Sequence, residues 1–255
     1  MVNKKILILI QARIGSTRLK SKVLKKILGK PVLWHVIERL KKLSNKNIIV
    51  ATSKKKENIK IVNFCKKNNI NYFAGSEKNV LDRFYQASKK FKGHNIIRIT
   101  ADCPLIDVKI IKRLIKYYFS NNFDHVGVAT GAGVHRTKIN KFPDGLDAEC
   151  FKFSALEKAW LNAKKISDKE HVTPYIWKRK NEFKIGVLKA KKDYSNQRWT
   201  LDTKEDFKFI KIIYKNLYQK NKNFCMDDII NFLDKNPKLY EINKMNVGKE
   251  KYSII

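Results

Sequence analysis

The chain has 255 residues, of which 43% are hydrophobic and 31% are charged, so it can bury a sizeable core and is not an intrinsically disordered protein. Lys and Arg number 56 against 23 Asp and Glu, a formal net charge of +33 that on its own would suit a polyanionic partner. Most of these bases are Lys scattered along the chain, which indicates solvated faces and argues against a specific nucleic-acid partner.

No apolar stretch reaches the roughly 18 residues needed to span a membrane, and the run at residues 6–10 is shorter than the core of a signal peptide. The cysteines lie far apart, at Cys65, Cys103, Cys150 and Cys225, without the spacing of a zinc site or a disulfide framework. We therefore expect a cytoplasmic protein with reduced core cysteines and no membrane insertion.

The first half of the chain alternates strand and helix patterns. Residues 5–11 form a continuous, Ile-rich run typical of a strand buried on both faces of a parallel sheet. After Pro31, apolar residues recur with helical spacing from Val32 to Leu40. Further strands are predicted at residues 47–52, 71–74 and 95–100, and further helices at residues 57–68 and 80–91.

The second half is less regular. Residues 109–119 have a helical pattern and residues 124–129 a strand pattern. From 130 to 192 the alternation is lost and Gly and Pro mark loops, with one further helix predicted at 154–163, so we interpret this segment as an insertion or subdomain. Regular patterns return at 198–202, a strand-like segment, and at 204–218, an amphipathic helix expected to pack on the main sheet.

These patterns predict a three-layer α/β sandwich with a mainly parallel, Rossmann-like sheet. We expect a single domain at residues 1–243 that includes the insertion at 130–192. A polar C-terminal tail at 244–255 is expected to be disordered.

The loop after the first strand is the most informative segment. Loops at the carboxyl ends of parallel strands are where α/β sheets bind ligands. Gly15 and Ser16 allow backbone N–H groups to approach an anion, while Arg13, Arg18 and Lys22 supply three cations for a triphosphate. The loop has neither a Walker A sequence nor a dinucleotide fingerprint, so its spacing alone leaves phosphate binding and an ordinary basic loop as alternatives.

Two aspartates follow strand patterns in the same way. Asp102 comes after the strand at 95–100, and Asp202 comes after the strand-like residues 198–201. Carboxylates converging from two strand ends suit Mg²⁺, which takes oxygen ligands from protein, water and substrate phosphates. Each aspartate also precedes a predicted helix, and the residues alone favour a helix cap over a metal ligand.

Ordered motifs extend over most of the chain, from about residue 5 to residue 243. They are IQARIGSTRL at 10–19 with Lys22, ATS at 51–53, GSE at 75–77 with VLDR at 80–83, RITADCPLID at 98–107, PDGLD at 143–147, EHVTPY at 170–175 and RWTLDT at 198–203. Together they closely resemble the cytidylyltransferases related to the spore coat polysaccharide protein SpsF, which are similar to the acylneuraminate and 3-deoxy-manno-octulosonate cytidylyltransferases. The resemblance implies the nucleotide-diphospho-sugar transferase fold.

The resemblance also assigns roles to residues that match the motifs. It implies a CTP-phosphate loop at Arg13, Gly15, Ser16, Arg18 and Lys22, with Ala12 as a further nucleotide-binding residue. It implies base and ribose contacts at Ala51, Thr52, Asp82, Arg83 and Thr100. It makes metal binding the better interpretation of Asp102 and Asp202, which with Arg13 and Lys22 are the expected catalytic residues. Lys20-Ser21 and Ala101 depart from the usual Pro-Gly and Gly of the family without removing a chemical group.

Candidates for the acceptor site lie in the irregular segment and just after it: Asp144, Asp147, Glu170, His171 and Arg198. His171 could position or deprotonate an acceptor, although a lone His is more often structural. Asp144 and Asp147 could bind acceptor hydroxyls, although Pro-Asp-Gly is also an ordinary turn sequence.

The implied activity is transfer of CMP from CTP, with Mg²⁺ as cofactor, to a small acidic sugar or to a phosphate- or phosphonate-type acceptor, with release of pyrophosphate. Such an enzyme would serve surface polysaccharide or glycoconjugate synthesis, and the family analogy implies a homodimer built partly by residues 130–192. A nucleotidyltransferase of other base specificity, a nucleotide-sugar glycosyltransferase and a basic RNA-binding protein remain as alternatives. The acceptor itself stays open.

Overall fold

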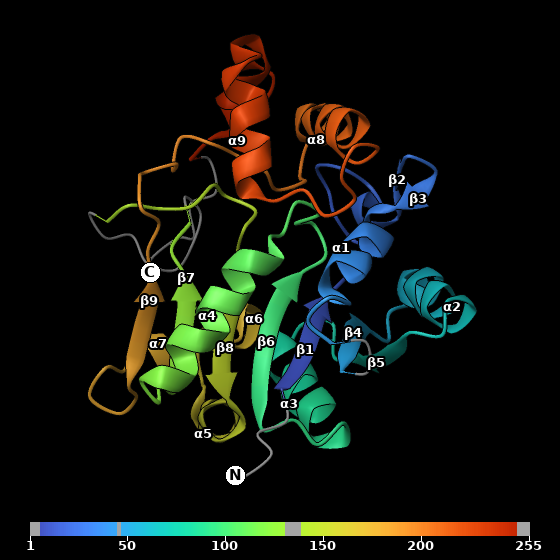
Figure 1. Cartoon of the computed structure of the whole chain (residues 1–255). Helices are drawn as coiled ribbons and strands as arrows, with labels where there is room; N and C mark the ends of the chain where they lie inside the picture. Colours follow the sequence, from blue (N-terminus) through green and yellow to red (C-terminus); the bar gives the residue numbers. More distant parts are fainter. Residues whose placement is uncertain (1–5, 45–46, 131–138, 249–255) are drawn as a thin grey trace.

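The computed structural model describes residues 6–44, 47–130 and 139–248. Within them, seven strands form one sheet in the order β5-β4-β1-β6-β8-β7-β9 (Figure 1). Neighbouring strands are parallel except at β8, which runs antiparallel to β6 and β7, so the predicted mainly parallel sheet is confirmed. The strands are β1 (Ile6–Gln11), β4 (Ile48–Ser53), β5 (Asn71–Gly75), β6 (Asn95–Thr100), β7 (His125–Val128), β8 (Glu149–Lys152) and β9 (Ile185–Leu188).

Helices cover both faces of the sheet and complete the three predicted layers (Figure 1). On β1, Ile8 and Ile10 pack toward one face and Leu7 and Leu9 toward the other, as the two-residue period of a strand requires. The first face carries α1 (Val32–Leu40), α2 (Ile59–Lys67) and α4 (Val108–Ser120). The second face carries α3 (Val80–Lys90), α5 (Phe153–Asn162), α6 (Ile166–His171) and α7 (Pro174–Trp177).

Two more helices, α8 (Lys204–Leu217) and α9 (Met226–Asp234), lie beyond the carboxyl ends of the parallel strands (Figure 1). Their buried side chains, including Phe209, Ile213 and Ile229, join the hydrophobic core of the first face. The shorter elements are the paired strands β2 (Lys26–Ile27) and β3 (Lys30–Pro31) and 3-10 helices at Lys22–Leu24, Lys56–Asn58, Pro237–Glu241 and Lys244–Asn246.

The irregular segment at 130–192 belongs to the central sheet, which the sequence analysis did not predict. β8 lies between β6 and β7, and β9 forms the edge of the sheet beside β7. Both strands are short and lie among turns and short helices, in a segment where no regular alternation of strand and helix patterns marks them. The segment is therefore not a separate subdomain, although residues 131–138, with the predicted loop glycines Gly131 and Gly133, lie outside the described residues.

The predicted strand at residues 198–202 is wrong. Its backbone makes an isolated bridge between Arg198 and Asp144 and does not extend the sheet. Trp199 and Leu201 are buried, with exposed fractions of 1% and 0%, and their alternation with polar residues imitated a strand. The segment is held by this burial and by side-chain contacts, and it lies against the sheet edge without joining it.

The polar tail is ordered further than expected. The side-chain amide of Asn243 donates to the carbonyl oxygen of Arg198 and to Oδ1 of Asp206, both at 2.9 Å. Asn246 donates to the Thr203 hydroxyl at 3.0 Å. Residues 244–248 are thus folded against the start of α8, and residues 249–255 lie outside the described residues.

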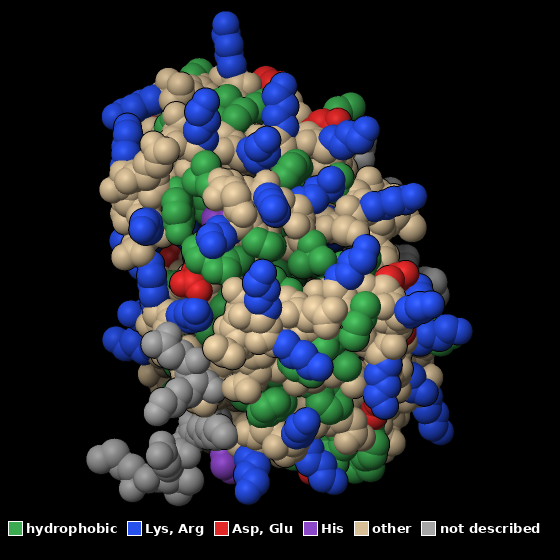
Figure 2. Space-filling model, turned by 90° about the vertical axis from the view of Figure 1, so that its right-hand side faces the viewer, with side chains coloured by type: hydrophobic (Ala, Val, Ile, Leu, Met, Phe, Trp, Pro, Cys, Tyr) green, Lys and Arg blue, Asp and Glu red, His purple; other side chains and the backbone are tan. Residues whose placement is uncertain are grey.

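The surface and the interior agree with the composition. Figure 2 shows Lys and Arg side chains dispersed over one face of the molecule, between hydrophobic and neutral groups. All four cysteines are buried and free, as expected. Of the helices in the described ranges, none is long and apolar enough to cross a membrane.

Candidate functional site

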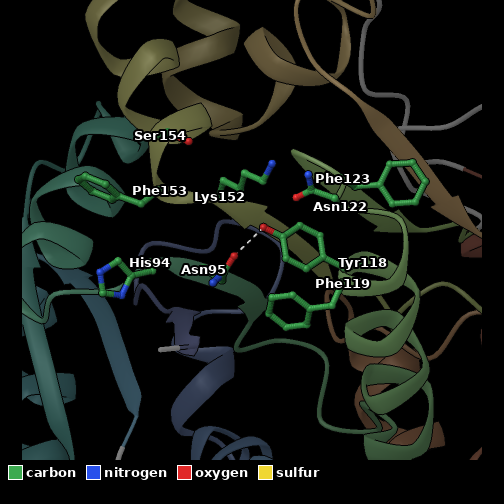
Figure 3. Close-up of a pocket in the computed structure, with 9 residues that line it drawn as sticks. All are labelled: His94, Asn95, Tyr118, Phe119, Asn122, Phe123, Lys152, Phe153 and Ser154. Atoms are coloured by element: carbon green, nitrogen blue, oxygen red, sulfur yellow. Dashed lines mark hydrogen bonds between the residues drawn. The ribbon is translucent and has the colours of Figure 1, made fainter. Parts of the chain in front are cut away.

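A cavity of about 350 Å³ lies near the amino end of β6, at the edge of the sheet opposite to the basic loop. Aromatic side chains line it, and Tyr118 donates a hydrogen bond of 2.8 Å to Asn95 within it (Figure 3). Its lining includes none of the residues that the sequence selects for chemistry. The residues selected for chemistry lie at the other edge of the sheet, at the carboxyl ends of the parallel strands.

Strands β1, β4 and β6 end side by side at the carboxyl edge. Gln11, the last residue of β1, pairs with Ala51 of β4 and with Thr100 of β6. The basic loop at residues 12–22 leaves the sheet here, and Asp102 follows two residues after Thr100. The register therefore brings the predicted phosphate loop and the first predicted metal ligand to the edge where α/β sheets bind ligands.

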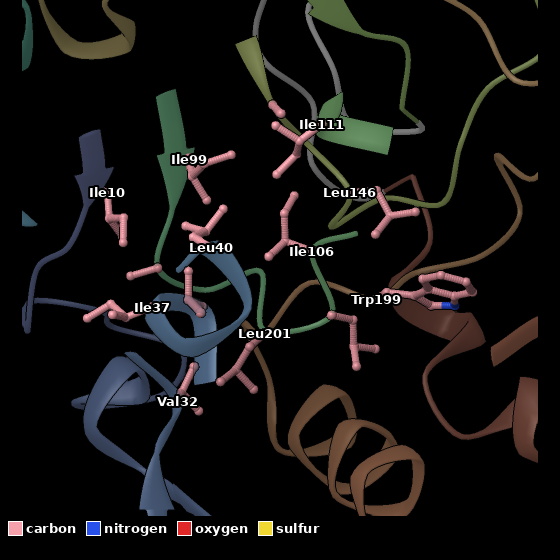
Figure 4. Close-up of a cluster of buried hydrophobic side chains, with 14 of the residues drawn as sticks. Ile10, Val32, Ile37, Leu40, Ile99, Ile106, Ile111, Leu146, Trp199 and Leu201 are labelled. Carbon is pink, nitrogen blue, oxygen red and sulfur yellow. The ribbon is translucent and has the colours of Figure 1, made fainter. Parts of the chain in front are cut away.

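Packing of its neighbours in the hydrophobic core places Asp202 at the same edge of the sheet. Leu201 and Trp199 belong to the same buried cluster as Ile106, in the loop after β6 (Figure 4). The Leu201 N–H also donates to the carbonyl oxygen of Asp102 at 2.9 Å. Two segments far apart in sequence thus place their aspartates next to each other.

Lys22 joins the two aspartates. Its ammonium group donates to Oδ2 of Asp102 and, at 2.5 Å, to Oδ1 of Asp202. Burial disfavours the charged ammonium, but the two carboxylates outweigh this effect and raise the pKa of Lys22 well above its ordinary value. The edge therefore holds a cation between two carboxylates from different segments.

Neither aspartate caps a helix. The cap of α4 is Asp107, whose Oδ1 accepts from the Lys109 N–H at 2.6 Å. The cap of α8 is Thr203, which forms a capping box with Asp206. The capping alternative for Asp102 and Asp202 is excluded by this geometry.

Arg198 fixes Asp202 from the inside of the protein. Its side chain is 1% exposed and donates to Asp144 at 2.7 Å, to Asp202 at 2.9 Å and to Asp206 at 3.2 Å. Asp206 also accepts from the Asp202 N–H at 3.0 Å. A buried guanidinium shared among three carboxylates orients those groups, and the expected contact of Arg198 with the acceptor stays a prediction.

A second cation of the loop, Arg18, lies beside this pair of aspartates. Arg13 and Arg18 are exposed, and Arg18 Nη2 lies 3.3 Å from Oδ2 of Asp202. Ser16 is half-buried, and its hydroxyl accepts from the Leu19 N–H at 3.4 Å. Arg18 is thus next to the carboxylates and Arg13 is exposed on the same loop, an arrangement that suits a triphosphate.

Asn58 holds the loop in shape, a role that the sequence analysis missed. Its Oδ1 accepts from the Ile14 N–H at 2.7 Å, and its amide donates to the Ser53 hydroxyl at 2.6 Å. A side chain at Gly15 would bring a Cβ to 2.9 Å from Oε1 of Glu57, so the loop approaches this neighbour closely. An Asn in a polar stretch carries no pattern that predicts such a long-range contact.

The predicted base and ribose positions, taken together with Ala12, divide into two groups. Ala12 and Ala51 are buried and joined by a backbone hydrogen bond of 3.1 Å, and Thr52 is also buried. Thr100 lies at the edge, with its hydroxyl 3.1 Å from Sγ of Cys103. These four residues lie at the carboxyl ends of β1, β4 and β6, beside the basic loop.

Asp82 and Arg83 are placed differently, on α3. Asp82 accepts from Trp160 Nε1 at 2.9 Å and so links α3 to α5. Arg83 is 1% exposed and donates to the carbonyl oxygen of Ser76 at 2.9 Å. Burial lowers the pKa of Arg83 to about 10. The Asp82 carboxylate is thus engaged by α5, and its expected contact with the nucleotide stays a prediction.

The acceptor candidates Asp144 and Asp147 lie around one turn. Gly145 has a φ of +102°, and a Cβ there would lie 2.5 Å from the Thr200 backbone nitrogen, so the turn requires Gly. Asp147 accepts from the Thr130 hydroxyl and, at 2.8 Å, from the Gly145 N–H. Burial raises the pKa of Asp147, and the charge of nearby Asp102 adds to the effect.

Glu170 and His171 end α6, with Glu170 exposed and His171 half-buried. Burial lowers the pKa of His171, and the positive charges of Arg98 and Lys178 act in the same direction. His171 therefore favours the neutral imidazole, which can accept a proton or a hydrogen bond.

A comparison with known families decides the classification. The profile of the cytidylyltransferase family matches residues 7–242. The chain belongs to this family.

Two relatives cover nearly the whole cytidylyltransferase. An uncharacterized protein of Methanocaldococcus jannaschii is 43% identical over 97% of this chain and 98% of its own length. The spore coat polysaccharide biosynthesis protein SpsF of Bacillus subtilis is 30% identical over 91% of this chain and 95% of its own. The predicted resemblance to SpsF-like cytidylyltransferases is confirmed.

Solved structures agree. A cytidylyltransferase from Leptospira borgpetersenii superposes with a TM-score of 0.83 at 30% identity, covering 92% of this chain and 96% of the other. A CMP:2-keto-3-deoxy-manno-octonic acid synthetase complexed with CTP superposes with a TM-score of 0.60 at 16% identity, covering 83% and 98%. The second match shows the shared fold alone.

Proposed function

We propose that this cytidylyltransferase transfers CMP from CTP to a small acidic sugar or to a phosphate- or phosphonate-type acceptor, and releases pyrophosphate. The observation that carries the proposal is the Lys22 ammonium held between Asp102 and Asp202, beside a loop that presents Arg13 and Arg18. The similarity to a spore coat polysaccharide biosynthesis protein supports a role in surface polysaccharide or glycoconjugate synthesis.

The proposed reaction is a single displacement at phosphorus. An acceptor oxygen attacks the α-phosphorus of CTP and forms a new P–O bond, while the bond to the oxygen bridging the α- and β-phosphates breaks. Pyrophosphate leaves with that electron pair, and the acceptor hydroxyl proton passes to a base or to water. Arg13, Arg18 and Lys22 would hold the β- and γ-phosphates, because such transfers depend on positioning and charge neutralisation.

The residues present fit a magnesium ion. Asp102 and Asp202 supply hard oxygen donors and already hold a cationic group between them. Within the described residues no cluster of three or more His, Cys, Asp or Glu side chains suits a metal, so water and phosphate oxygens would complete the coordination, as Mg²⁺ favours. When bound there, Mg²⁺ would neutralise charge on the phosphates. Lys22 would then exchange its carboxylate partners for phosphate oxygens.

The proposal includes a homodimer built partly by residues 130–192 and a cytoplasmic location. Two large hydrophobic side chains in this segment support the dimer, because Leu161 is 68% exposed and Ile166 is 81% exposed. Apolar side chains with such large exposed fractions, on two neighbouring helices, are common where a second chain packs.

Nucleotide binding tests the proposal. In calorimetric titrations with Mg²⁺ present, CTP should bind more tightly than ATP, GTP or UTP, and pyrophosphate release should appear with one member of a panel of sugar acids, sugar phosphates and phosphonates. Equal or tighter binding of another triphosphate would contradict the cytidylyl assignment.

A further inference from the structure

A strained turn lies directly after α6. Val172 is fully buried and has φ 74° and ψ −57°, and the Thr173 N–H donates to the carbonyl oxygen of His171 at 2.9 Å. This is a γ-turn of the rare, strained form, and a β-branched residue is particularly costly there. The next residue, Thr173, has φ −101° and ψ −9° although it precedes Pro174, which disfavours that region.

Two such residues in succession persist only where their surroundings hold them in place, at a cost on the order of 1–3 kcal/mol each. Helix α6 could end more easily with Gly or Asn in the left-handed conformation. The buried contacts of the turn must therefore supply the compensation.

Glu149 on β8 is the anchor of this turn. Its Oε1 accepts from the Thr173 hydroxyl at 2.7 Å and lies 3.0 Å from His125 Nε2. Its Oε2 accepts from Arg98 at 2.6 Å. Burial opposes ionisation of Glu149, but Arg98 and the hydrogen bonds outweigh it and lower its pKa. Thr173 and His125 are fully buried, so water does not compete for the hydrogen bonds of this network.

The network also lies next to the candidate site. Arg98 donates to the side-chain oxygen of Gln11, the residue before the basic loop, at 3.0 Å. The charge of Glu149 acts on Asp147 and on His171, so this carboxylate lies near both acceptor candidates. The turn thus has a defined position relative to the carboxyl edge.

We propose that Glu149 is a positioning residue, which holds the strained turn at Val172 through the Thr173 hydroxyl and so keeps the His171 imidazole on the acceptor side of the site. The acceptor in this statement rests on the proposed function, whereas the anchoring does not. Neither the family motifs nor the roles assigned above include Glu149.

Thr173→Val tests the anchor, because it keeps the side-chain shape and removes the hydroxyl, and Thr173→Ser is the matched control that keeps it. The five histidines can be followed by NMR during a pH titration. The charges of Glu170, Arg98, Lys178 and Glu149 act on His171, and these residues are unchanged in both variants. With the turn released, His171 should become more exposed and its pKa should rise toward the ordinary value in T173V, while T173S should match the wild type.

Amide hydrogen exchange at residue 173 provides a second readout that needs no acceptor. Exchange should accelerate at least tenfold in Thr173→Val and in Glu149→Gln, and stay unchanged in T173S. CTP affinity, measured by calorimetry, should remain within about twofold of the wild type in T173V.

The outcomes separate the two proposals. If T173V leaves both the His171 titration and the exchange rate unchanged, Glu149 does not hold the turn, whatever the CTP affinity of the variant is. If T173V abolishes CTP binding, the turn serves the nucleotide side and the acceptor-side assignment is overturned. If the wild type itself fails to bind CTP, the proposed function fails, while the titration still decides the anchoring.

Discussion

The ammonium group of Lys22 contacts two carboxylates that come from distant segments of the chain. Without it, Asp102 and Asp202 would face each other as like charges in a partly buried place. Under the proposed function a divalent cation would take the same position, so Lys22 and the metal would compete for it until phosphates offered Lys22 other partners.

This competition predicts the effect of Lys22→Met. In the absence of nucleotide, the variant should bind Mn²⁺ at least about tenfold more tightly than the wild type, because the competing positive charge is gone. Lys20→Met, an exposed change in the same loop, should behave as the wild type. Equal Mn²⁺ affinity in all three proteins would show that Lys22 does not occupy a metal position.

The aspartates themselves are tested by Asp102→Asn and Asp202→Asn. Neither residue caps a helix, so both variants should fold, with circular dichroism spectra like that of the wild type. Turnover should fall at least a hundredfold, on the order of 3 kcal/mol of transition-state stabilisation, and Mg²⁺ should no longer strengthen CTP binding. Arg18→Lys keeps its charge and should have a smaller effect. Near-normal pyrophosphate release in either Asn variant would remove the metal assignment.

Glu149 predicts a pH dependence of folding. Its pKa in the folded chain lies below the ordinary value of 4.5, so the unfolded chain binds more protons near that pH. The stability that Glu149 contributes is complete above about pH 4.5 and is lost as the pH falls further. In urea unfolding at a series of pH values, the difference between wild type and Glu149→Gln should therefore shrink below pH 4.5. A constant difference would indicate that Glu149 is not held ionised.

At the scale of elements, the segment before α8 shows how a site residue is positioned without a strand. Leu201 is fully buried in the main core, and its N–H donates to the Asp102 carbonyl oxygen. Arg198 then fixes the carboxylates of Asp144, Asp202 and Asp206. Core packing and one guanidinium replace the ladder of hydrogen bonds that a strand would have supplied.

Leu201→Ala should therefore destabilise the protein by roughly 2–5 kcal/mol, the usual cost of truncating a buried Leu. Because the backbone beside Asp202 loses its anchor, CTP affinity in Mg²⁺ should fall as well. Leu161→Ala, the same substitution at an exposed position, should leave the stability of the monomer unchanged within about 0.5 kcal/mol. Denaturant unfolding compares the two, and equal effects would contradict the anchoring role of Leu201.

At the scale of the whole molecule, the dispersed charged side chains and the exposed apolar side chains suit different kinds of contact. Lys and Arg are spread over the face in Figure 2, which suits solvation more than a single polyanion track. Leu161 and Ile166 instead expose apolar side chains on the segment expected to form the dimer.

Light scattering at micromolar concentration should report about twice the chain mass of 29.9 kDa. Leu161→Lys combined with Ile166→Lys should shift the protein toward the monomer, because two charges would be buried without partners in the interface. If the wild type is a dimer and the double Lys variant remains one, the interface lies elsewhere. A wild-type monomer would remove the dimer proposal.

The sequence by itself determined the strands and helices of the first half, because buried parallel strands appear there as continuous apolar runs and amphipathic helices have a clear period. It also placed Asp102 and the basic loop, since both follow such strands directly. The short strands β8 and β9 lie among turns and short helices that hid them, and the alternation around Trp199 and Leu201 was mistaken for a strand.

Contacts between distant segments were decided only by the tertiary structure. Local sequence favoured a helix cap at Asp102 and Asp202, but the register of β1 with β6 and the burial of Leu201 brought both carboxylates to Lys22. Asn58, Arg198 and Glu149 are likewise defined by partners far along the chain. The physical reason is that a side-chain hydrogen bond or ion pair depends on a distance in space, and no local period or propensity records that distance.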